Sequence, residues 1–282
     1  MIIIDGKKAA ATLREELKKK ISELKSTYNA VPGLTVILVG EDPPSKIYVR
    51  NKEKFANEVG IKSEVVRYPD TIEEKTILNK IEELNKNSNV SGILVQLPLP
   101  IHIDKRKIIE AILPDKDVDG LHPMNVGNLS SGYDSMVPCT PLGCYLLIKD
   151  VEKDLNGKHA VVIGRSNLNG KPMTQLLLKE NCTVTITHSK TKDLKAECKR
   201  ADIIVAAVGR PKLVKADWVK KDAIVIDVGI NKTDTGLVGD VDFDEVSKVA
   251  KAVTPVPGGV GPMTIACLLS NTVECFKKVR SN

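Results

Sequence analysis

The sequence has few aromatic residues and no long apolar run, and each shortage argues against a class of protein. Three Phe, one Trp and five Tyr among 282 residues leave little for the base-stacking surfaces of proteins that bind single-stranded nucleic acid. No uninterrupted apolar stretch approaches the length that spans a bilayer. The opening residues, Met-Ile-Ile-Ile-Asp-Gly-Lys-Lys, place charge after the apolar run. We therefore expect a cytoplasmic protein with no secretory signal and no membrane partner.

The patterns of cysteine and charge argue against a metal-binding and a nucleic-acid-binding protein. The six cysteines form no C-x-x-C pair and have no histidines at metal-ligand spacing, so we expect reduced, mostly buried thiols and no metal site. The net charge of +6 is mild, and the lysines are spread over many helices rather than gathered in one stripe. This argues against nucleic acid as a partner and fits an anionic cofactor and a polyanionic substrate.

Strand-like and helix-like runs alternate along the chain, which predicts parallel sheets with right-handed crossovers. A first helix is indicated by apolar residues at steps of three and four from Ala10 to Leu24. The run 90–97 is too evenly apolar for an edge strand, and Ser45 is placed to cap a helix. Strands are predicted at 34–39, 65–68, 90–96, 159–164, 182–187, 202–208 and 223–228, and further helices at 45–59, 72–84, 105–113, 142–149 and 262–279.

Residues 98–141 are loops rich in Pro, Gly, Asn and Asp around one helix, so a domain boundary is expected in or just after them. We predict a two-lobed α/β fold with a cleft between the lobes. The N-terminal α/β domain would comprise 1–141, joined by the last helix at 262–282. A Rossmann-like dinucleotide-binding domain would comprise 142–261.

The segment 159–172, HAVVIGRSNLNGKP, reads as a strand, a glycine turn and the start of a helix. Such a turn holds phosphate, because a glycine lets the backbone approach the ligand and the helix N-terminus attracts an anion. The spacing fits neither common phosphate motif: Ser166 stands where GxGxxG needs glycine, and five residues separate Gly164 from Gly170. Alone, this turn is equally typical of α/β proteins that bind nothing charged.

The next predicted strand, 182–187, ends in His-Ser-Lys-Thr. In a dinucleotide fold this point lies beside the adenosine ribose, where an acidic residue would favour NAD. Here Ser189, Lys190 and Arg165 offer a hydroxyl and cations, which favour the extra phosphate of NADP. The alternative is that Lys190 and Lys192 only solubilise a loop.

Ser45, Tyr48 and Lys52 fall on one helix face, so a hydroxyl, a phenol and an ammonium project together. A lysine in such a cluster can transfer protons if burial or a cationic neighbour lowers its pKa. The segment alone favours a plainer interpretation, in which the basic residues form a solvated face: Lys46, Arg50, Lys52 and Lys54.

Three other segments carry polar or rigid features. Gln96 ends a buried strand, where its amide would bind either a ligand or its own loop. Carboxylates alternate at Asp115, Asp117 and Asp119, but Gly120 follows directly, so the spacing is not that of a calcium loop. The Gly- and Pro-rich segment 254–264 is either a substrate-shaping loop or a stiff connector.

Taken together, these segments resemble the bifunctional methylenetetrahydrofolate dehydrogenase/cyclohydrolase family over essentially the whole chain. The resemblance rests on eight motifs in order: Ser45-x-x-Tyr48-x-x-x-Lys52, Val95-Gln-Leu-Pro-Leu-Pro100, Lys116-Asp-Val-Asp-Gly120, Pro138-Cys-Thr-Pro141, Gly164-Arg-Ser166, His188-Ser189, Asp227-Val-Gly-Ile230 and Pro255-Val-Pro-Gly-Gly-Val-Gly-Pro-Met-Thr264.

The resemblance implies oxidation of 5,10-methylenetetrahydrofolate with NADP⁺, followed by hydrolysis of the methenyl product to 10-formyltetrahydrofolate in the same site. It implies tetrahydrofolate derivatives as partners, no metal and a homodimer. Lys52 would handle protons, Gln96 would hold it in its active state, Tyr48 would stack near the folate and Asp119 would grip the pterin ring. Further folate contacts are implied for Val95, Leu97, Pro257, Gly258, Gly259 and Pro262, and NADP contacts for Gly164, Arg165, Ser166, Ser189 and Ile230.

Asn169 departs from the family, which more often has valine there, and we expect it to alter packing under the cofactor without abolishing binding. Two other functions stay open. One is a dehydrogenase without the hydrolytic step, which intact Lys52 and Gln96 disfavour. The other is an NADP-binding redox sensor without turnover.

Overall fold

The computed structural model describes residues 1–234 and 236–281, and the chain divides into two compact units. We call them by their main sheets. The three-stranded unit comprises Ala11–Asn128, Tyr133–Cys139 and the chain from Ile265 onward. The six-stranded unit comprises Met1–Ala10, Leu129–Gly132 and Thr140–Thr264.

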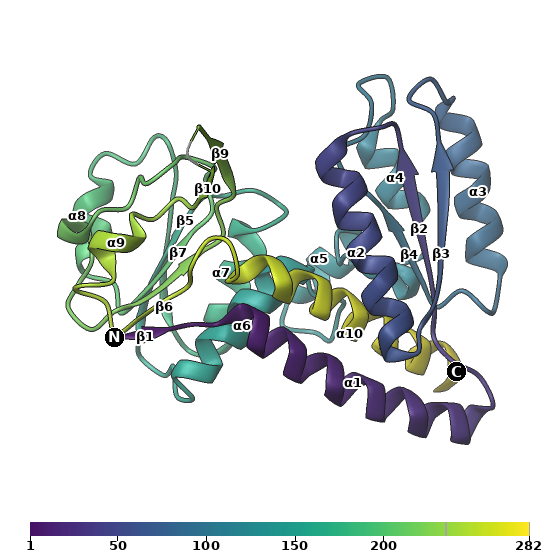
Figure 1. Ribbon diagram of the computed structural model, residues 1–282, viewed down its shortest axis with the longest axis horizontal. Helices are drawn as coiled ribbons and strands as arrows, with labels where there is room; N and C mark the ends of the chain where they lie inside the picture. The colour runs from purple at the N-terminus through teal and green to yellow at the C-terminus, as the bar shows by residue number, and fades with distance from the viewer. Residues whose placement is uncertain (235, 282) are drawn as a thin grey trace. The chain divides into compact units, whose positions relative to one another are not determined.

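The three-stranded unit is built on a parallel sheet in the order β3-β2-β4 (Figure 1). Helices alternate with its strands, as predicted. The strands are β2 (Gly33–Val39), β3 (Lys62–Tyr68) and β4 (Gly92–Val95). The helices are α1 (Gly6–Tyr28), α2 (Pro43–Val59), α3 (Glu74–Lys86), α4 (Lys105–Ala111), the 3₁₀ turn η1 (Pro114–Lys116), α5 (Pro123–Ser130) and α10 (Val260–Ser281).

The core of this unit forms because apolar residues recur with the period of each element. Every residue of β2 is buried, as expected for a central parallel strand with both faces covered. On α3, Ile77, Ile81 and Leu84 recur at steps of four and three, and they pack in one cluster with Ile37 and Ile93. Burial of each such side chain contributes about 1.5–3 kcal/mol to folding.

The prediction that the run 90–97 is not an edge strand was wrong. β4 pairs with β2 alone among the sheet strands and lies at the edge of the sheet. It is nevertheless fully buried, because the chain after η1 covers it: Ile93 forms a parallel bridge with Asp117. The apolar pattern of β4 indicated burial correctly. The free edge of β4 is covered by the segment that carries Asp117 and not by another strand of the sheet.

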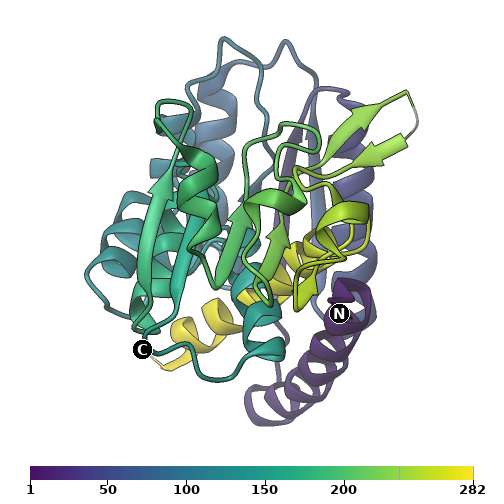
Figure 2. The same cartoon turned by 90° about the vertical axis from the view of Figure 1, so that its left-hand side faces the viewer.

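The six-stranded unit contains a parallel sheet in the order β1-β11-β8-β7-β5-β6 (Figure 2). Its strands are β1 (Ile2–Ile3), β5 (His159–Ile163), β6 (Thr183–Thr187), β7 (Ile203–Ala206), β8 (Ile224–Asp227) and β11 (Ala252–Val253). The other elements are α6 (Cys139–Val151), α7 (Gly170–Lys179), α8 (Leu194–Lys199), η2 (Ala216–Trp218), α9 (Phe243–Val246) and a hairpin of β9 (Asn231–Thr233) and β10 (Gly236–Val238).

The order of the strands fixes where this unit can bind a ligand. β5 comes first in the alternation and pairs with β6 on one side and β7 on the other. After β6 the chain therefore crosses to the other side of β5 to form β7, which makes the gap between β5 and β7 a topological switch point. Doubly wound sheets bind ligands at the carboxyl ends of the strands beside such a point. The glycine turn at 164 follows β5 directly.

The sequence did not predict β1. Ile2 and Ile3 pair with Ala252 and Val253 of β11, and a two-residue strand is too short to show a period. This pairing adds a strand to the six-stranded sheet, and residues 1–10 cluster with that unit rather than with the rest of the N-terminal segment.

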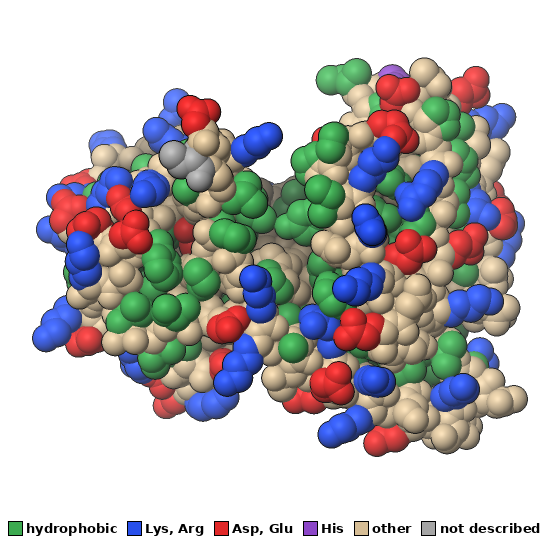
Figure 3. All heavy atoms as spheres, in the orientation of Figure 1, with side chains coloured by type: hydrophobic (Ala, Val, Ile, Leu, Met, Phe, Trp, Pro, Cys, Tyr) green, Lys and Arg blue, Asp and Glu red, His purple; other side chains and the backbone are tan. Residues whose placement is uncertain are grey.

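The distribution of surface charge and the burial of the cysteines agree with the expectations from the sequence. Lys and Arg side chains are interspersed with Asp and Glu over the face shown in Figure 3. All six cysteines are buried. Among the described residues, none of the helices has the length and apolar character needed to cross a membrane.

Candidate active site

Helix α2 presents the lysine of the predicted proton-transfer cluster, and its start is fixed by Asp42. The Asp42 carboxylate accepts from the Ser45 backbone N–H at 3.0 Å and from the Ser45 hydroxyl at 2.6 Å, and these bonds lower the pKa of Asp42. The prediction that Ser45 caps the helix was therefore wrong. Prolines at the first two helical positions, which need no N–H partner, let the helix begin two residues earlier.

Lys52 lies on the inner face of α2 and is only 8% exposed. The interpretation of a solvated basic face is wrong for this residue, although it holds for its neighbours. Burial lowers the pKa of Lys52, while the charge of Asp119 opposes this shift. Tyr48, one turn earlier, is half-buried, and burial raises its pKa. The exposed basic residues of the helix are Lys46, Arg50 and Lys54.

Gln96 holds the Lys52 amine. Lys52 Nζ donates to Gln96 Oε1 at 2.8 Å, and Gln96 Nε2 donates to the backbone carbonyl of Leu97 at 2.6 Å. The second bond directs the amide oxygen toward Lys52. The two alternatives for Gln96 thus combine, since its NH₂ group binds its own loop and its oxygen binds a side chain. Val95, the buried last residue of β4, carries this loop.

Asp119 completes the polar cluster. Burial raises its pKa, and the Lys52 cation opposes the shift, so the two groups are electrostatically coupled. The Cys139 thiol donates to the Val118 carbonyl at 3.3 Å, and burial raises its pKa well above the ordinary value. The structure therefore brings together Lys52, Gln96 and Asp119 within the three-stranded unit.

The residues that anchor the Asp119 segment were missed by the sequence analysis. Lys116 Nζ donates to the carbonyls of Leu84, Asn85 and Asn87 at 2.8–2.9 Å. These carbonyls lie at the end of α3. Those of Leu84 and Asn87 also accept from the backbone N–H groups of Asn87 and Val90, so Lys116 adds a charged donor to all three. A signal is present in Lys116-Asp-Val-Asp-Gly120, where a lysine stands beside the alternating carboxylates. Asp117 is also structural, because it accepts from the His122 backbone N–H and from Asn125.

Helix α10 supplies a second anchor. Asn271 Nδ2 donates to the carbonyls of Val118 and Val137, at 2.8 and 2.9 Å. Asn271 is 5% exposed, and it lies 152 positions beyond Asp119 in the sequence numbering. No local pattern could have indicated this contact, because it depends on how the last helix packs.

The glycine turn after β5 is shaped for close backbone approach. Gly164 has φ +119°, and a Cβ there would lie 2.3 Å from the Ala207 carbonyl oxygen. Only glycine fits this position. Ser166 Oγ accepts from the Asn169 backbone N–H at 3.1 Å, which fixes the turn before α7, while Arg165 is exposed.

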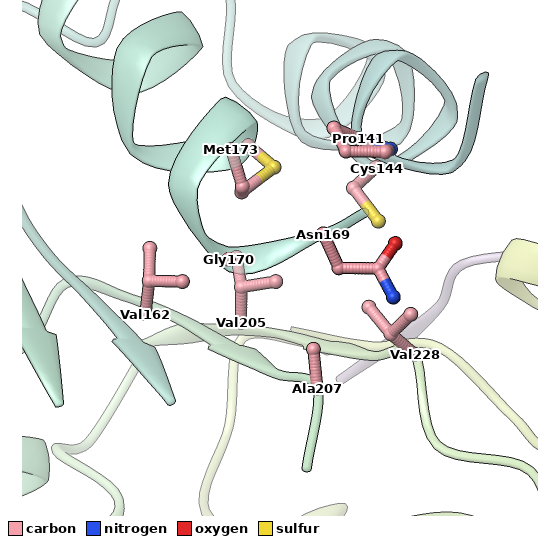
Figure 4. Close-up of a pocket in the computed structure, with 9 residues that line it drawn as sticks. All are labelled: Pro141, Cys144, Val162, Asn169, Gly170, Met173, Val205, Ala207 and Val228. Atoms are coloured by element: carbon pink, nitrogen blue, oxygen red, sulfur yellow. The ribbon is translucent and has the colours of Figure 1, made fainter. Parts of the chain in front are cut away.

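Asn169 lines a small hollow under this turn (Figure 4). Its amide is directed toward Val228, among mostly apolar side chains. This position agrees with an effect on packing beneath a cofactor, which stays a prediction. The other lining residues are Pro141, Cys144, Val162, Gly170, Met173, Val205 and Ala207.

The remaining predicted cofactor contacts follow the ends of β6 and β8. Ser189 and Lys190 are exposed after β6, in a turn closed by the His188 N–H donating to Thr191 Oγ1 at 3.0 Å. Ile230 follows β8 and is 53% exposed. These positions are at the carboxyl ends of the strands, where a dinucleotide binds.

The loop before α10 belongs to the six-stranded unit. Pro257 is exposed, Gly259 is buried and Pro262 lies in the first turn of α10. The Gly258 carbonyl accepts from the Lys7 backbone N–H at 3.2 Å, which ties the loop to the start of α1.

Two family models match most of the chain. The tetrahydrofolate dehydrogenase/cyclohydrolase catalytic domain matches residues 4–119, and the NAD(P)-binding domain of the same family matches residues 138–280. The chain is 78% identical to the bifunctional protein FolD of Pelagibacter ubique over 278 residues, which cover 99% of both chains.

Two solved structures are also similar. The bifunctional FolD methylenetetrahydrofolate dehydrogenase/cyclohydrolase of Campylobacter jejuni is 51% identical, with a TM-score of 0.96 over 99% of each chain. The Trypanosoma brucei enzyme, solved with NADP cofactor and inhibitor, is 38% identical, with a TM-score of 0.95 over 100% of this chain and 99% of that one. The chain belongs to the tetrahydrofolate dehydrogenase/cyclohydrolase family.

Proposed function

We propose that Lys52 is the proton-handling residue of a bifunctional enzyme. The enzyme oxidises 5,10-methylenetetrahydrofolate with NADP⁺ and hydrolyses the methenyl product to 10-formyltetrahydrofolate. One observation carries the assignment of Lys52: its amine is buried, donates to Gln96 at 2.8 Å and is coupled to Asp119. A buried lysine with a lowered pKa can act as a base near neutral pH, whereas an exposed lysine is protonated there.

The residues of the six-stranded unit fit NADP. A pyrophosphate needs a backbone that it can approach closely, and Gly164 provides it, since a Cβ at this position would collide with Ala207. At the start of α7, the Lys171 N–H donates to the Ser166 carbonyl and Pro172 has no N–H, so the positive end of the helix dipole, and not a row of free donors, would attract the anion. We assign the extra phosphate to Arg165 and Ser189, which are exposed, and the nicotinamide side to the backbone at Ile230.

The first reaction requires control of charge. When bound, NADP⁺ accepts a hydride from the methylene carbon of the folate. Loss of the hydride leaves a cationic folate, and a neutral Lys52 amine adds no like charge beside it. Asp119 supplies the opposite charge. Its oxygens also match the amino and ring N–H donors of the pterin, to which we assign it.

The second reaction requires movement of a proton. Water attacks the cationic methenyl carbon, and the neutral Lys52 amine accepts the first proton as the C–O bond forms. Gln96 Oε1 fixes the amine and stabilises the ammonium that results. The bond from this carbon to N5 then breaks, and N5 takes up the remaining hydroxyl proton, which gives the 10-formyl product. General base catalysis of this kind typically contributes about 10² to 10⁴-fold in rate.

Other folate contacts are proposed from position. Tyr48 lies one helical turn before Lys52, which suits stacking near the folate. Backbone at Val95 and Leu97 flanks Gln96. We also assign folate contacts to Pro257, Gly258, Gly259 and Pro262. We propose two functional domains: a folate domain of residues 1–141 plus 262–282, and an NADP domain of residues 142–261.

Two assays test the function. The first follows NADPH formation from methylenetetrahydrofolate and NADP⁺. The second follows hydrolysis of methenyltetrahydrofolate without NADP⁺. We expect both activities in the wild-type protein. NADPH formation without hydrolysis would indicate a dehydrogenase alone, and NADP⁺ binding without either activity would indicate a sensor. Wild-type hydrolysis by Lys52→Ala would overturn the role of Lys52.

The homodimer and the cytoplasmic location are further proposals, supported by the family resemblance. A mass measurement in solution tests the first, and we expect twice the mass of the 282-residue chain. A monomer at assay concentrations would contradict it.

A further inference from the structure

Two carboxylates outside the Lys52 cluster are buried in the six-stranded unit. Asp227 ends β8 and is 3% exposed, while Asp240 follows β10 and is 0% exposed. The Asp240 backbone N–H donates to Asp227 Oδ1 at 2.9 Å, so the two residues are joined directly. Buried carboxylates are costly unless several donors satisfy them.

Asp240 is satisfied mainly by backbone groups of one turn. Its Oδ2 accepts from the N–H groups of Val208 and Gly209, at 2.7 and 3.0 Å. Its Oδ1 accepts from the Arg210 N–H at 2.8 Å and from Asn231 Nδ2 at 2.9 Å. Three consecutive N–H groups are thus directed at one carboxylate. The conformation of the turn after β7 depends on this side chain.

Asp227 joins the loop after β8 to the chain after β10. It accepts from the N–H groups of Gly229, Asp240 and Val241, at 2.9–3.0 Å. The fit leaves no room for a side chain at either neighbouring glycine. A Cβ at Gly239 would lie 1.8 Å from Asp227 Oδ2, and one at Gly229 would lie 2.2 Å from Asp240 Oδ1.

Both loops border the place where the dinucleotide is assigned. The turn after β7 begins at Ala207, whose carbonyl closely approaches Gly164. The loop after β8 carries the exposed Ile230. We propose that Asp240 is a positioning residue for NADP: it holds the backbone at 208–210 and, together with Asp227, fixes Gly229 and Asn231 on either side of Ile230, in the conformation that receives the cofactor. This inference rests on the proposed function.

The substitution Asp240→Asn tests the requirement for two acceptor oxygens. An amide has one acceptor oxygen, and its NH₂ group would face a backbone N–H donor in place of the other oxygen. Either Arg210 or the pair Val208 and Gly209 then loses its partner, and the turn must move. We expect the Kd for NADP⁺ to rise at least about tenfold, the size of a lost bond to a charged group.

The control is Asp242→Asn, which removes the same charge two residues away. Asp242 pairs with the side chains of Lys215 and Lys212, at 2.8 and 3.7 Å. Calorimetric titration with NADP⁺ compares wild type and both variants, and the Asp242 variant should bind within about twofold of wild type. Hydrolysis of methenyltetrahydrofolate without NADP⁺ is measured on the same samples.

The expected result is weakened NADP⁺ binding by Asp240→Asn, with hydrolysis at the wild-type rate. NADP⁺ binding within about twofold of wild type would overturn the proposal. A parallel loss of binding and hydrolysis would also overturn it, because it would indicate a merely structural role. If wild type itself bound no NADP⁺, the proposed function would fail instead.

If Asp240→Asn does not fold, hydrogen exchange on the wild-type protein gives the answer. The amides of Val208, Gly209 and Arg210 should be protected without NADP⁺, because the carboxylate already holds them. If these amides exchanged freely and became protected only when NADP⁺ was added, the proposal would be contradicted, since the cofactor and not Asp240 would then order the turn.

Discussion

The substitution Gln96→Glu tests the environment of Lys52 most severely. It replaces the amide oxygen, 2.8 Å from Lys52 Nζ, with a carboxylate of similar shape. Opposite charges about 4 Å apart attract by about 4 kcal/mol at an effective dielectric constant of about 20. That energy favours the ammonium and raises the pKa of Lys52. At about 1.4 kcal/mol per factor of ten, the neutral amine becomes rarer by a factor on the order of 10³.

The hydrolysis of methenyltetrahydrofolate, measured against pH, reports this change. The active base is the neutral amine, so activity rises as pH rises through the pKa of Lys52. Gln96→Glu should therefore slow hydrolysis at neutral pH and move the acid limb of the profile to higher pH. Gln96→Met, which removes the acceptor without adding charge, should move the limb to lower pH, because the ammonium loses its partner. A wild-type profile in Gln96→Glu would refute the reasoning.

Three further predictions follow from single contacts. Lys116→Met removes a charged donor from three carbonyls at the end of α3 and leaves that of Asn85 without its donor, and urea unfolding should show a loss of about 1–3 kcal/mol in the free energy of unfolding; unchanged stability would contradict the anchoring role. Gly164→Ala places a methyl against the Ala207 carbonyl, so calorimetry should show loss of NADP⁺ binding, while cofactor-free hydrolysis continues; normal binding would exclude the turn as the phosphate site. Wild-type hydrolysis should decline as acidity protonates Lys52, and a flat acid limb would argue against that residue as the base.

The elements of the fold were largely predictable because their signals are local. The step of three and four along α3 and the apolar run of β2 can be read within a dozen residues. β1 could not be predicted, because two residues carry no period and their pairing with β11 depends on chain 250 positions away. The edge position of β4 was missed for a related reason, since burial is visible in sequence while its cause is not.

For the candidate site, too, the residues could be recognised from the sequence but their contacts could not. Lys52 and Gln96 were recognised by type and position, but their bond links residues 44 positions apart. The local charge pattern of α2 favoured solvation. Lys52 differs from Lys54 because it is on the buried face of the helix and donates to Gln96, which follows β4. Asp240 gave no sequence signal, because three of its four donors are backbone N–H groups that every residue except proline possesses.

The proposed proton transfer depends most on one property, the lowered pKa of the buried Lys52 amine. Carbon-13 NMR of protein labelled at the lysine ε-carbons can titrate this amine directly, with Lys52→Arg identifying its resonance. We predict that Lys52 titrates below the ordinary lysine value of about 10.4, because burial disfavours its charged form. Titration at or above that value would contradict the central claim, since Lys52 would then carry a proton throughout the working pH range.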